Sequence, residues 1–209
     1  MKLIVISSSK QPAQEHKIVT ALLESGLKTF HVRKPSMSTL ELRNYIEAIP
    51  QHFHNRLVIH SHHKLASKYK LAGIHLTNVH RQRKFSSWLR IRMLTSFLPN
   101  LIVSTSFYNL GRLYTNKQKY SYIFLGTIFN GFSGELNPGF NKYSIRAGQE
   151  RIDIPLIARG GITKDSLQSC NDLNFQGAAL ASCIWGNPDP VNQWSEILKF
   201  LAAKEISHT

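Results

Sequence analysis

The chain has 209 residues, of which 42% are hydrophobic and 10% aromatic, and its formal net charge is +14. This composition excludes a disordered chain. The excess of positive charge favours anionic partners such as phosphorylated metabolites, nucleic acid or an anionic surface, although a basic surface that serves only solubility explains it equally well. We predict a globular protein with a single domain over residues 1–209.

The hydrophobic pattern gives no sign of a membrane segment or of export. No apolar run reaches the roughly 20 residues that a membrane-spanning helix needs. The amino-terminal run Met-Lys-Leu-Ile-Val-Ile-Ser-Ser-Ser lacks a cleavage-site pattern and predicts a first strand rather than a signal peptide. Cys170 and Cys183 have no metal-binding spacing and suggest no disulfide framework. We therefore expect a cytoplasmic protein without a membrane partner.

Eight short apolar segments alternate with segments of helical spacing along the chain. The predicted strands are residues 2–7, 29–33, 56–60, 73–76, 101–105, 122–129, a run within 153–162, and 177–181. The predicted helices are residues 13–25, 38–49, 62–70, about 108–115, about 142–149, 163–171 and 191–203. This alternation predicts an α/β fold with a parallel sheet, a single (β/α)8 TIM barrel.

Local signals mark the ends of two predicted helices. Gly26 follows the first helix and is expected to end it as a C-cap neighbour. Ser38 begins the second helix, and Glu41 stands three residues on, in the capping-box position. Pro50 then stops that helix because proline cannot continue it.

A basic segment occupies residues 80–92. Phe85 and Trp88 are interleaved with its basic residues, which would suit the stacking of nucleic-acid bases. Because Phe85, Trp88, Leu89 and Arg92 fit helical spacing, we favour a solvated helix with an apolar inner face. Nucleic acid is therefore the less favoured partner.

Small residues follow the last two predicted strands. Gly160 and Gly161 come after the seventh strand, and Ser182 comes after the eighth. In an eight-stranded barrel the loops after strands 7 and 8 commonly form a phosphate site from backbone N–H groups. Glycines allow the backbone to approach such a ligand, although paired glycines also make ordinary tight turns. Their place in the strand count favours a phosphate site.

Imidazoles, hydroxyls and an arginine end the remaining strands, where a barrel carries its active site. Arg33 suits a phosphate, because its guanidinium binds two oxygens at once. His31, His60 and His62 are candidates for general acids or metal ligands, and His60 and His62 would share one face of an extended segment. A zinc site is an alternative that no nearby Cys, Asp or Glu completes. The other polar strand ends are His75, Thr77, Ser104, Ser106 and Thr127.

Seven short motifs occur in a fixed order along the chain. They are His31–Pro35, Val58–His62, Gly73–Leu76, Val103–Ser104, Leu125–Phe129, Ala158–Ile162 and Gly177–Ile184. Together they resemble the motifs of the thiamine phosphate synthase/TenI family, over nearly the whole chain. The family's synthase joins a pyrimidine diphosphate to a thiazole phosphate, giving thiamine phosphate and pyrophosphate, with Mg²⁺ holding the diphosphate. Its TenI branch isomerises a thiazole tautomer.

The resemblance implies a role for each matching position. Arg33 would meet the pyrophosphate, Ser104 would lie near the pyrimidine and the leaving group, and His31 stands where the family has its pyrimidine-binding glutamine. Together with the strand-end histidines, this gives a candidate catalytic set of His31, Arg33, His60, His62, Ser104 and Thr127. The implied substrate- and phosphate-binding set is Lys34, Ser133, Gly160, Gly161, Ala181 and Ser182.

The sequence departs from the family pattern at several functional positions. The two Mg²⁺-binding aspartates fall at Ser61 and near His80, so Mg²⁺, which the resemblance implies, lacks its usual ligands. The lysine after the strand-2 arginine is displaced to Lys34 or replaced by Pro35. The Thr-x-Thr-Lys loop reads Gly-Phe-Ser-Gly at residues 131–134, and the TenI histidine is replaced by Thr127.

Our leading hypothesis is a thiamine biosynthesis protein that binds thiazole phosphate and couples it to the pyrimidine diphosphate. The alternatives are a TenI-like tautomerase and a family member that binds a phosphorylated ligand without catalysis. We hypothesise that the histidines supply an acid or base where the family's own groups are missing, because imidazole titrates near neutral pH. The partners implied are phosphorylated small molecules, and a homo-oligomer is compatible with the sequence.

Overall fold

The computed structural model describes residues 1–8, 12, 14–131 and 133–208. Eight parallel strands follow one another in chain order and close into a barrel, with helices between successive strands. The predicted (β/α)8 fold is therefore confirmed. None of the described helices is long and apolar enough to cross a membrane. The chain divides into two compact units, residues 6–105 and residues 1–5 with 106–209; the single domain over 1–209 stays a prediction.

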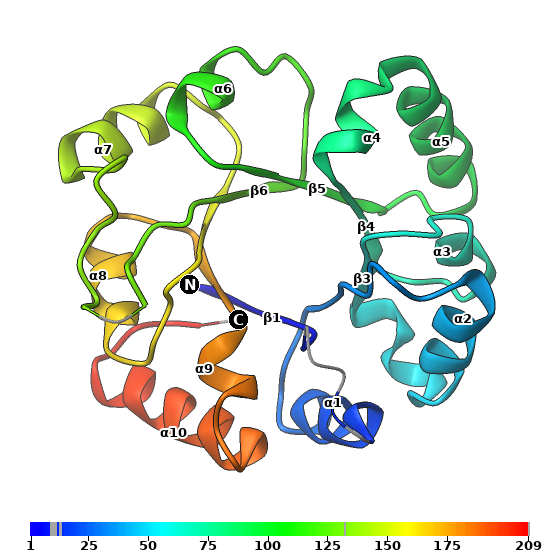
Figure 1. Ribbon diagram of the computed structural model, residues 1–209, viewed down its shortest axis with the longest axis horizontal. Coiled ribbons are helices and arrows are strands. Elements are labelled where there is room, and N and C mark those ends of the chain that lie inside the picture. The colour runs from blue at the N-terminus through cyan, green and yellow to red at the C-terminus, as the bar shows by residue number, and fades with distance from the viewer. Residues whose placement is uncertain (9–11, 13, 132, 209) are drawn as a thin grey trace. The chain divides into compact units, whose positions relative to one another are not determined.

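The unit of residues 6–105 is built from consecutive βα pairs (Figure 1). Its strands are β2 (Phe30–Val32), β3 (Leu57–Ile59), β4 (Gly73–Leu76) and β5 (Ile102–Phe107), which pair in parallel in this order. Its helices are α1 (Glu15–Glu24), α2 (Thr39–Glu47), the 3₁₀ helix η1 (Gln51–Arg56), α3 (Leu65–Lys68), α4 (Asn78–Gln82) and α5 (Lys84–Phe97). In this unit α1, α2 and α3 lie on the outer side of β2, β3 and β4 (Figure 1).

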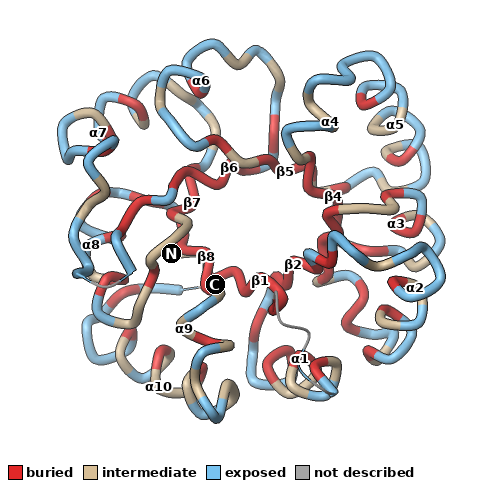
Figure 2. Tube along the Cα trace, viewed as in Figure 1, coloured by how far each residue is buried: buried red, intermediate tan, exposed pale blue. Residues whose placement is uncertain are grey.

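Residue chemistry accounts for the start and end of the first helices. Ser38 Oγ accepts a hydrogen bond from the Glu41 backbone N–H, and the Glu41 carboxylate accepts one from the Ser38 N–H. The predicted capping box is thus confirmed. Gly26 follows α1 with a φ of 98°, a conformation that favours glycine. The strands themselves are buried, as Figure 2 shows, because both faces of a barrel strand are covered.

The unit of residues 1–5 with 106–209 carries the other strands. These are β1 (Lys2–Ile6), β6 (Tyr122–Leu125), β7 (Leu156–Arg159) and β8 (Gly177–Leu180), of which β6, β7, β8 and β1 pair in parallel in this order. The helices are α6 (Leu110–Tyr114), α7 (Lys142–Glu150), α8 (Ser166–Asp172), α9 (Ser182–Trp185) and α10 (Pro190–Ala203). α10 buries Trp194, Ile197 and Leu201, whose spacing places them on one face of the helix.

Several boundaries differ from the prediction for local reasons. The strand expected over 122–129 ends at Leu125, because Gly126 has a φ of 136° and redirects the chain. The helix expected over 62–70 begins only at Leu65, since His62 has a φ of 49°. Neither η1 nor α9 was predicted, because each is a short element without a hydrophobic period of its own.

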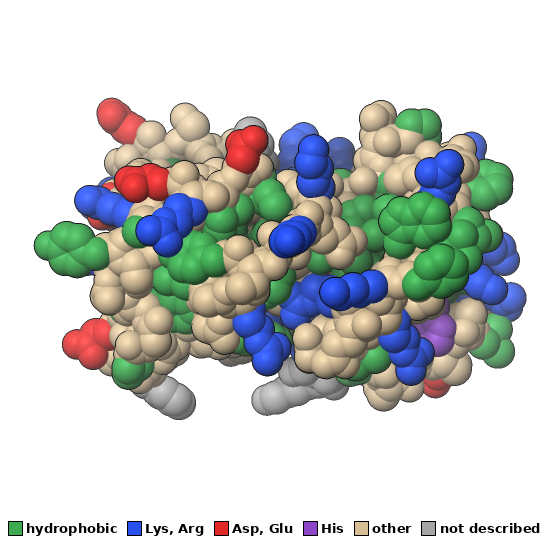
Figure 3. Space-filling view, turned by 90° about the horizontal axis from the view of Figure 1, so that it is seen from above, with side chains coloured by type: hydrophobic (Ala, Val, Ile, Leu, Met, Phe, Trp, Pro, Cys, Tyr) green, Lys and Arg blue, Asp and Glu red, His purple; other side chains and the backbone are tan. Residues whose placement is uncertain are grey.

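The basic segment forms two helices, α4 and α5, that meet at Arg83. Its predicted inner face is wrong: Phe85 is 75% exposed, and Trp88 and Leu89 are also exposed. α5 instead buries Ser87 and Leu94, which lie on another side of the helix. The outward stripe mixes aromatic and basic groups, since the Arg92 guanidinium lies 5.7 Å from the Trp88 ring. Hydrophobic side chains accordingly lie beside Lys and Arg at the right of Figure 3, where α4 and α5 lie.

Candidate active site

Three histidines come together in the unit of residues 6–105. His31 lies on β2, His60 directly follows β3, and His75 lies on β4; all three are buried. His31 Nδ1 and His60 Nε2 share a hydrogen bond of 2.9 Å. The His60 and His75 rings stack with their centroids 4.1 Å apart and 19° between their planes. One nitrogen from each of the three rings lies within 4.8 Å of the others. We call these residues the histidine cluster.

The pairing of the strands sets the histidine cluster in place. The His60 N–H donates to the Val32 carbonyl, which extends the β2–β3 pairing by one residue and brings His60 beside His31. His75 pairs with Ser104 across β4 and β5, and His75 Nδ1 lies 2.9 Å from Ser104 Oγ. Ser104 is fully buried, so its hydroxyl fixes the orientation of the His75 ring. His75 was recognised as a strand end, but the sequence held no signal that it, rather than His62, joins His31 and His60.

His62 lies outside the histidine cluster, which corrects the expectation that it shares a face with His60. Its positive φ turns the chain after β3, so residues 60–62 are not extended. The ring instead binds the segment before α2: His62 Nε2 lies 2.9 Å from the Met37 carbonyl oxygen and Nδ1 lies 2.8 Å from Thr39 Oγ1. These contacts describe a histidine that joins two loops.

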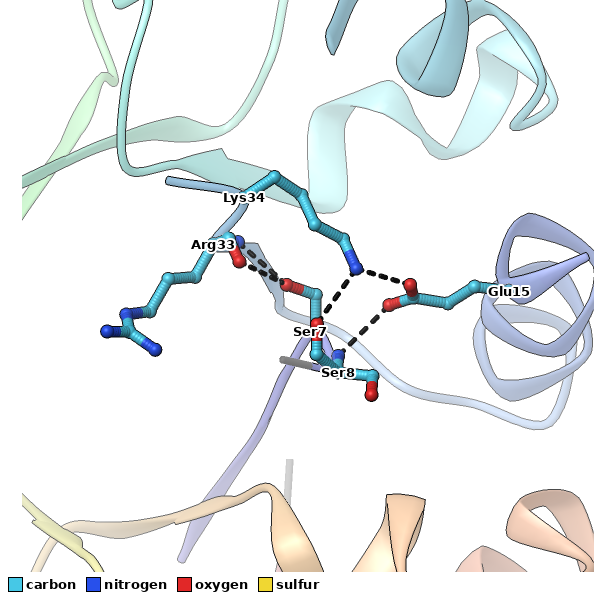
Figure 4. A network of polar contacts seen from close by, with 5 residues as sticks. All are labelled: Ser7, Ser8, Glu15, Arg33 and Lys34. Carbon is cyan, nitrogen blue, oxygen red and sulfur yellow. Dashed lines mark hydrogen bonds and ion pairs between the residues drawn. The ribbon is translucent and has the colours of Figure 1, made fainter. Parts of the chain in front are cut away.

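Arg33 is held by its backbone and exposes its side chain. The Ser7 hydroxyl accepts a hydrogen bond of 2.8 Å from the Arg33 N–H and donates one of 3.1 Å to the Arg33 carbonyl. The guanidinium points away from these contacts (Figure 4) and pairs with no described residue. A fixed backbone with a solvent-facing guanidinium suits the capture of an anion.

Lys34 has a different environment from Arg33, although the two are neighbours. Its side chain is 1% exposed, and its ammonium group forms an ion pair with Glu15 and donates to the Ser8 carbonyl at 2.9 Å (Figure 4). The second Glu15 oxygen accepts from the Ser8 N–H. The expectation that Lys34 binds substrate phosphate therefore conflicts with its contacts. Glu15 went unnoticed in the sequence because nothing there indicated that it would be buried.

A turn of two glycines follows β7 in the unit of residues 1–5 with 106–209. Gly160 and Gly161 have φ values of 85° and 68°, which residues other than glycine rarely adopt. A Cβ on Gly161 would lie 2.0 Å from the Phe129 carbonyl oxygen, and a Cβ on Gly160 would lie 2.8 Å from the Thr127 Cα. The segment after β6 thus packs directly against this turn, as the hydrogen bond of 3.1 Å from the Phe129 N–H to the Gly160 carbonyl confirms. We call residues 159–161 the glycine turn.

The other predicted residues of this unit are accessible. Thr127 is exposed, and its carbonyl accepts a hydrogen bond of 3.0 Å from Asn137 Nδ2. Ser133 is exposed in the loop after β6, where its hydroxyl accepts from the Glu135 N–H. Ala181 and Ser182 form the junction between β8 and α9. Phe132, which belongs to the same Gly-Phe-Ser-Gly loop, lies outside the described residues.

The positions that correspond to the implied Mg²⁺ ligands do not fit that ion. Ser61 Oγ is buried without a hydrogen-bond partner among the described residues. Burial, together with Arg90 and Arg83, lowers the pKa of His80, so cations already surround that ring. The sequence has no Asp or Glu between Glu47 and Glu135. Mg²⁺ requires oxygen ligands that include carboxylates, and this stretch offers none.

Comparison with known proteins gives a consistent result. Residues 3–184 match the sequence model of the thiamine monophosphate synthase family. A thiamine-phosphate synthase of Methanobrevibacter smithii is 20% identical over 96% of this chain and 95% of its own length. One of Pyrococcus abyssi is 23% identical with the same coverage. The crystal structure of thiamine phosphate pyrophosphorylase from Bacteroides thetaiotaomicron superposes with a TM-score of 0.75 and 26% identity, covering 98% of this chain and 99% of that one.

The closed parallel barrel with polar strand ends defines the protein as one of the (β/α)8 barrels. The family match covers most of the chain. The chain belongs to the thiamine monophosphate synthase family, and so to thiamine biosynthesis, as its motifs predicted.

Proposed function

We propose that this protein binds a thiazole phosphate and joins it to a pyrimidine diphosphate, giving thiamine phosphate and pyrophosphate. The observation that carries the proposal is the family match over residues 3–184. Relatives with nearly full coverage of both chains, from Methanobrevibacter smithii and Pyrococcus abyssi, are named thiamine-phosphate synthases. The net charge of +14 is consistent with two anionic substrates.

In this proposal the glycine turn binds the phosphate group of the thiazole substrate. Positive φ values at Gly160 and Gly161 turn successive backbone groups in directions that a side chain would hinder. Backbone N–H groups in such a turn bind an anion without needing a charged side chain. The junction of Ala181 and Ser182 contributes further backbone groups, as in other barrels with a phosphate at this end.

In this proposal Arg33 binds the diphosphate group of the pyrimidine substrate. The reaction forms a bond between the thiazole nitrogen and the pyrimidine methylene carbon and breaks the bond from that carbon to the diphosphate oxygen. Negative charge accumulates on the leaving diphosphate, so a guanidinium that contacts it stabilises the transition state. Arg33 suits this role because its side chain is exposed and unpaired among the described residues, whereas Lys34 is committed to Glu15.

The test is a coupled assay with untagged protein, pyrimidine diphosphate and thiazole phosphate, with Mg²⁺ and Zn²⁺ supplied in separate reactions. We expect thiamine phosphate and pyrophosphate in equal amounts. Arg33→Ala should lower kcat/KM by about 10- to 100-fold, the effect of losing a hydrogen bond to a charged group. Arg112→Ala removes an equal charge from an exposed helix and should leave kcat/KM unchanged. The absence of both products under all metal conditions would refute the proposed reaction.

A second candidate function is binding of the thiazole phosphate without turnover. The observation that favours it is the lack of any Asp or Glu between residues 47 and 135, where the family has its Mg²⁺ ligands. A ligand that binds only the folded state raises the melting temperature further as its concentration rises above its Kd. A melting temperature that rises with thiazole phosphate, in a protein that forms no thiamine phosphate, would select this candidate over the synthase.

A further inference from the structure

The histidine cluster has the composition of a transition-metal site. His31, His60 and His75 each offer one imidazole nitrogen, and these atoms lie within 4.8 Å of one another. Imidazole is a preferred ligand of Zn²⁺, Cu²⁺, Fe²⁺ and Ni²⁺, whereas Mg²⁺ prefers oxygen. Three histidines with a fourth position open is the ligand set of catalytic zinc sites. The donor chemistry therefore points to a metal of another class than the one the family resemblance implies.

The distances are close to those that a metal ion requires. With zinc–nitrogen bonds of 2.0–2.1 Å in a tetrahedron, the ligand nitrogens lie about 3.3 Å apart. His31 Nδ1 and His60 Nε2 are 2.9 Å apart, so these two nitrogens need to separate by only a few tenths of an ångström. The nitrogens that the three rings offer lie within 4.8 Å of one another, so the rings would have to move closer together to hold one ion.

Ser104 supplies the partner that metal-binding histidines usually have. A histidine that binds a metal through one nitrogen ordinarily makes a hydrogen bond through the other, which fixes its tautomer and its orientation. His75 Nδ1 lies 2.9 Å from Ser104 Oγ, and β4 and β5 place these residues opposite each other. With Nδ1 of His75 on the serine, Nε2 is the nitrogen of that ring that a metal ion would take.

The burial of the three histidines also suits uncharged metal ligands. The three rings are 0%, 7% and 3% exposed, so protonating them would place cations in a poorly solvated site. Neutral imidazoles can bind a metal ion at neutral pH without first losing a proton. A divalent ion held by three neutral ligands keeps its full positive charge, so its fourth position would attract water or an anionic oxygen.

We propose that His31, His60 and His75 bind one Zn²⁺ ion, with Ser104 as a positioning residue that orients His75. The fourth ligand is water or an oxygen of a phosphorylated ligand. This proposal does not depend on the proposed function, because the site is defined by its nitrogen ligands and is tested by metal binding alone.

The test uses the untagged, full-length protein after removal of metals with a chelator. Titration with Zn²⁺ in a calorimeter should give one ion per chain, and Mg²⁺ should neither bind there nor compete. Co²⁺ should produce the visible absorption of a tetrahedral site and be displaced by Zn²⁺. X-ray absorption at the zinc edge should show nitrogen and oxygen neighbours at about 2.0–2.1 Å and no sulfur.

Variants connect the metal to the named residues. His31→Ala, His60→Ala and His75→Ala should each weaken Zn²⁺ binding by at least 100-fold, whereas His52→Ala, which removes an exposed histidine of η1, should have no effect. Ser104→Ala should weaken binding by about 10- to 100-fold and change the Co²⁺ spectrum. Circular dichroism identifies any variant that fails to fold, and the X-ray absorption of the unaltered protein does not depend on variants.

Two results would overturn the proposal. One is the failure of the unaltered protein to bind Zn²⁺ or Co²⁺ stoichiometrically, which would make the cluster a hydrogen-bonded group of neutral histidines. The other is binding that His52→Ala weakens as much as His60→Ala does, which would indicate adsorption at surface histidines. A protein that binds Zn²⁺ as expected but forms no thiamine phosphate would confirm this proposal and refute only the synthase.

Discussion

The glycine turn and the histidine cluster are built in opposite ways. The turn consists of backbone, and its glycines are required by positive φ values and by the close approach of Phe129. The cluster consists of side chains from β2, β3 and β4, brought together by the pairing of those strands. The shape of the glycine turn depends only on the two glycines. The chemistry of the histidine cluster depends on the identity of each side chain, so one substitution changes it. In this chain the two glycines are present, and the sequence between Glu47 and Glu135 has no Asp or Glu.

The largest effect tests how far the side chains at the end of β2 support the fold. Lys34→Met leaves the buried Glu15 carboxylate without its cationic partner, so we expect a loss of about 3–5 kcal/mol in the free energy of unfolding, measured by denaturant titration. Lys199→Met removes an exposed ion pair with Glu196 and should cost no more than about 1 kcal/mol. Equal losses in the two variants would show that the Lys34–Glu15 pair is not buried in solution.

The next effect tests the backbone origin of the glycine turn. Gly161→Ala combines an unfavourable φ with a clash against the Phe129 carbonyl, and should cost about 2–5 kcal/mol. Gly134→Ala keeps only the unfavourable φ and should cost about 1–2 kcal/mol. Gly131→Ala has neither problem, since its nearest neighbour would lie at 3.9 Å, and should be nearly neutral. Melting curves that rank these three variants in another order would contradict the account of the turn.

A smaller effect distinguishes His62 from the histidine cluster. His62→Asn tolerates the left-handed backbone but loses the bonds to the Met37 carbonyl and the Thr39 hydroxyl, so we expect a loss of about 1–2 kcal/mol. Zn²⁺ affinity should not change. The matched variant is His52→Asn, which should alter neither stability nor affinity. A loss of Zn²⁺ affinity in His62→Asn would show that His62 takes part in the metal site together with His31 and His60.

The smallest effect concerns the two thiols. Burial raises the pKa of Cys170 to about 12, and burial raises that of Cys183 to about 11 despite nearby backbone N–H groups. A raised thiol pKa reduces the thiolate at pH 8, so alkylation by iodoacetamide should be more than about 100-fold slower than for a model thiol and should accelerate as the pH rises. Mass spectrometry before and after unfolding measures this, and rapid alkylation of the folded protein at pH 8 would contradict the raised pKa of the two thiols.

The sequence was sufficient for features that depend on local chemistry. The capping box of Ser38 and Glu41, the strand at Gly73–Leu76 and the barrel order follow from residue type and period, and all are confirmed. Gly160 and Gly161 were located by their place after the seventh strand, and their positive φ values agree with the expected turn.

The sequence was insufficient where a side chain chooses between two environments. Lys34 and Arg33 are adjacent basic residues, yet only the burial of Glu15 explains why one is paired and the other exposed. The spacing of Phe85, Trp88 and Leu89 correctly indicated a helix. α5 exposes these three residues, however, and buries a different side of the helix, which carries Leu94. His75 belongs to the cluster because of the register that places it opposite Ser104. That register depends on how β4 and β5 pair, which the pattern within either segment does not show.

The most direct test of the account is calorimetric titration of the unaltered protein with thiazole phosphate, with no metal added. Because the proposed phosphate contacts come from the backbone of the glycine turn and not from charged side chains, we predict one binding site per chain whose affinity falls only modestly as salt concentration rises. Addition of Mg²⁺ should leave that affinity unchanged. The absence of any binding heat, together with an unchanged melting temperature at saturating thiazole phosphate, would contradict the central claim that this chain retains the family's grip on its phosphorylated substrate.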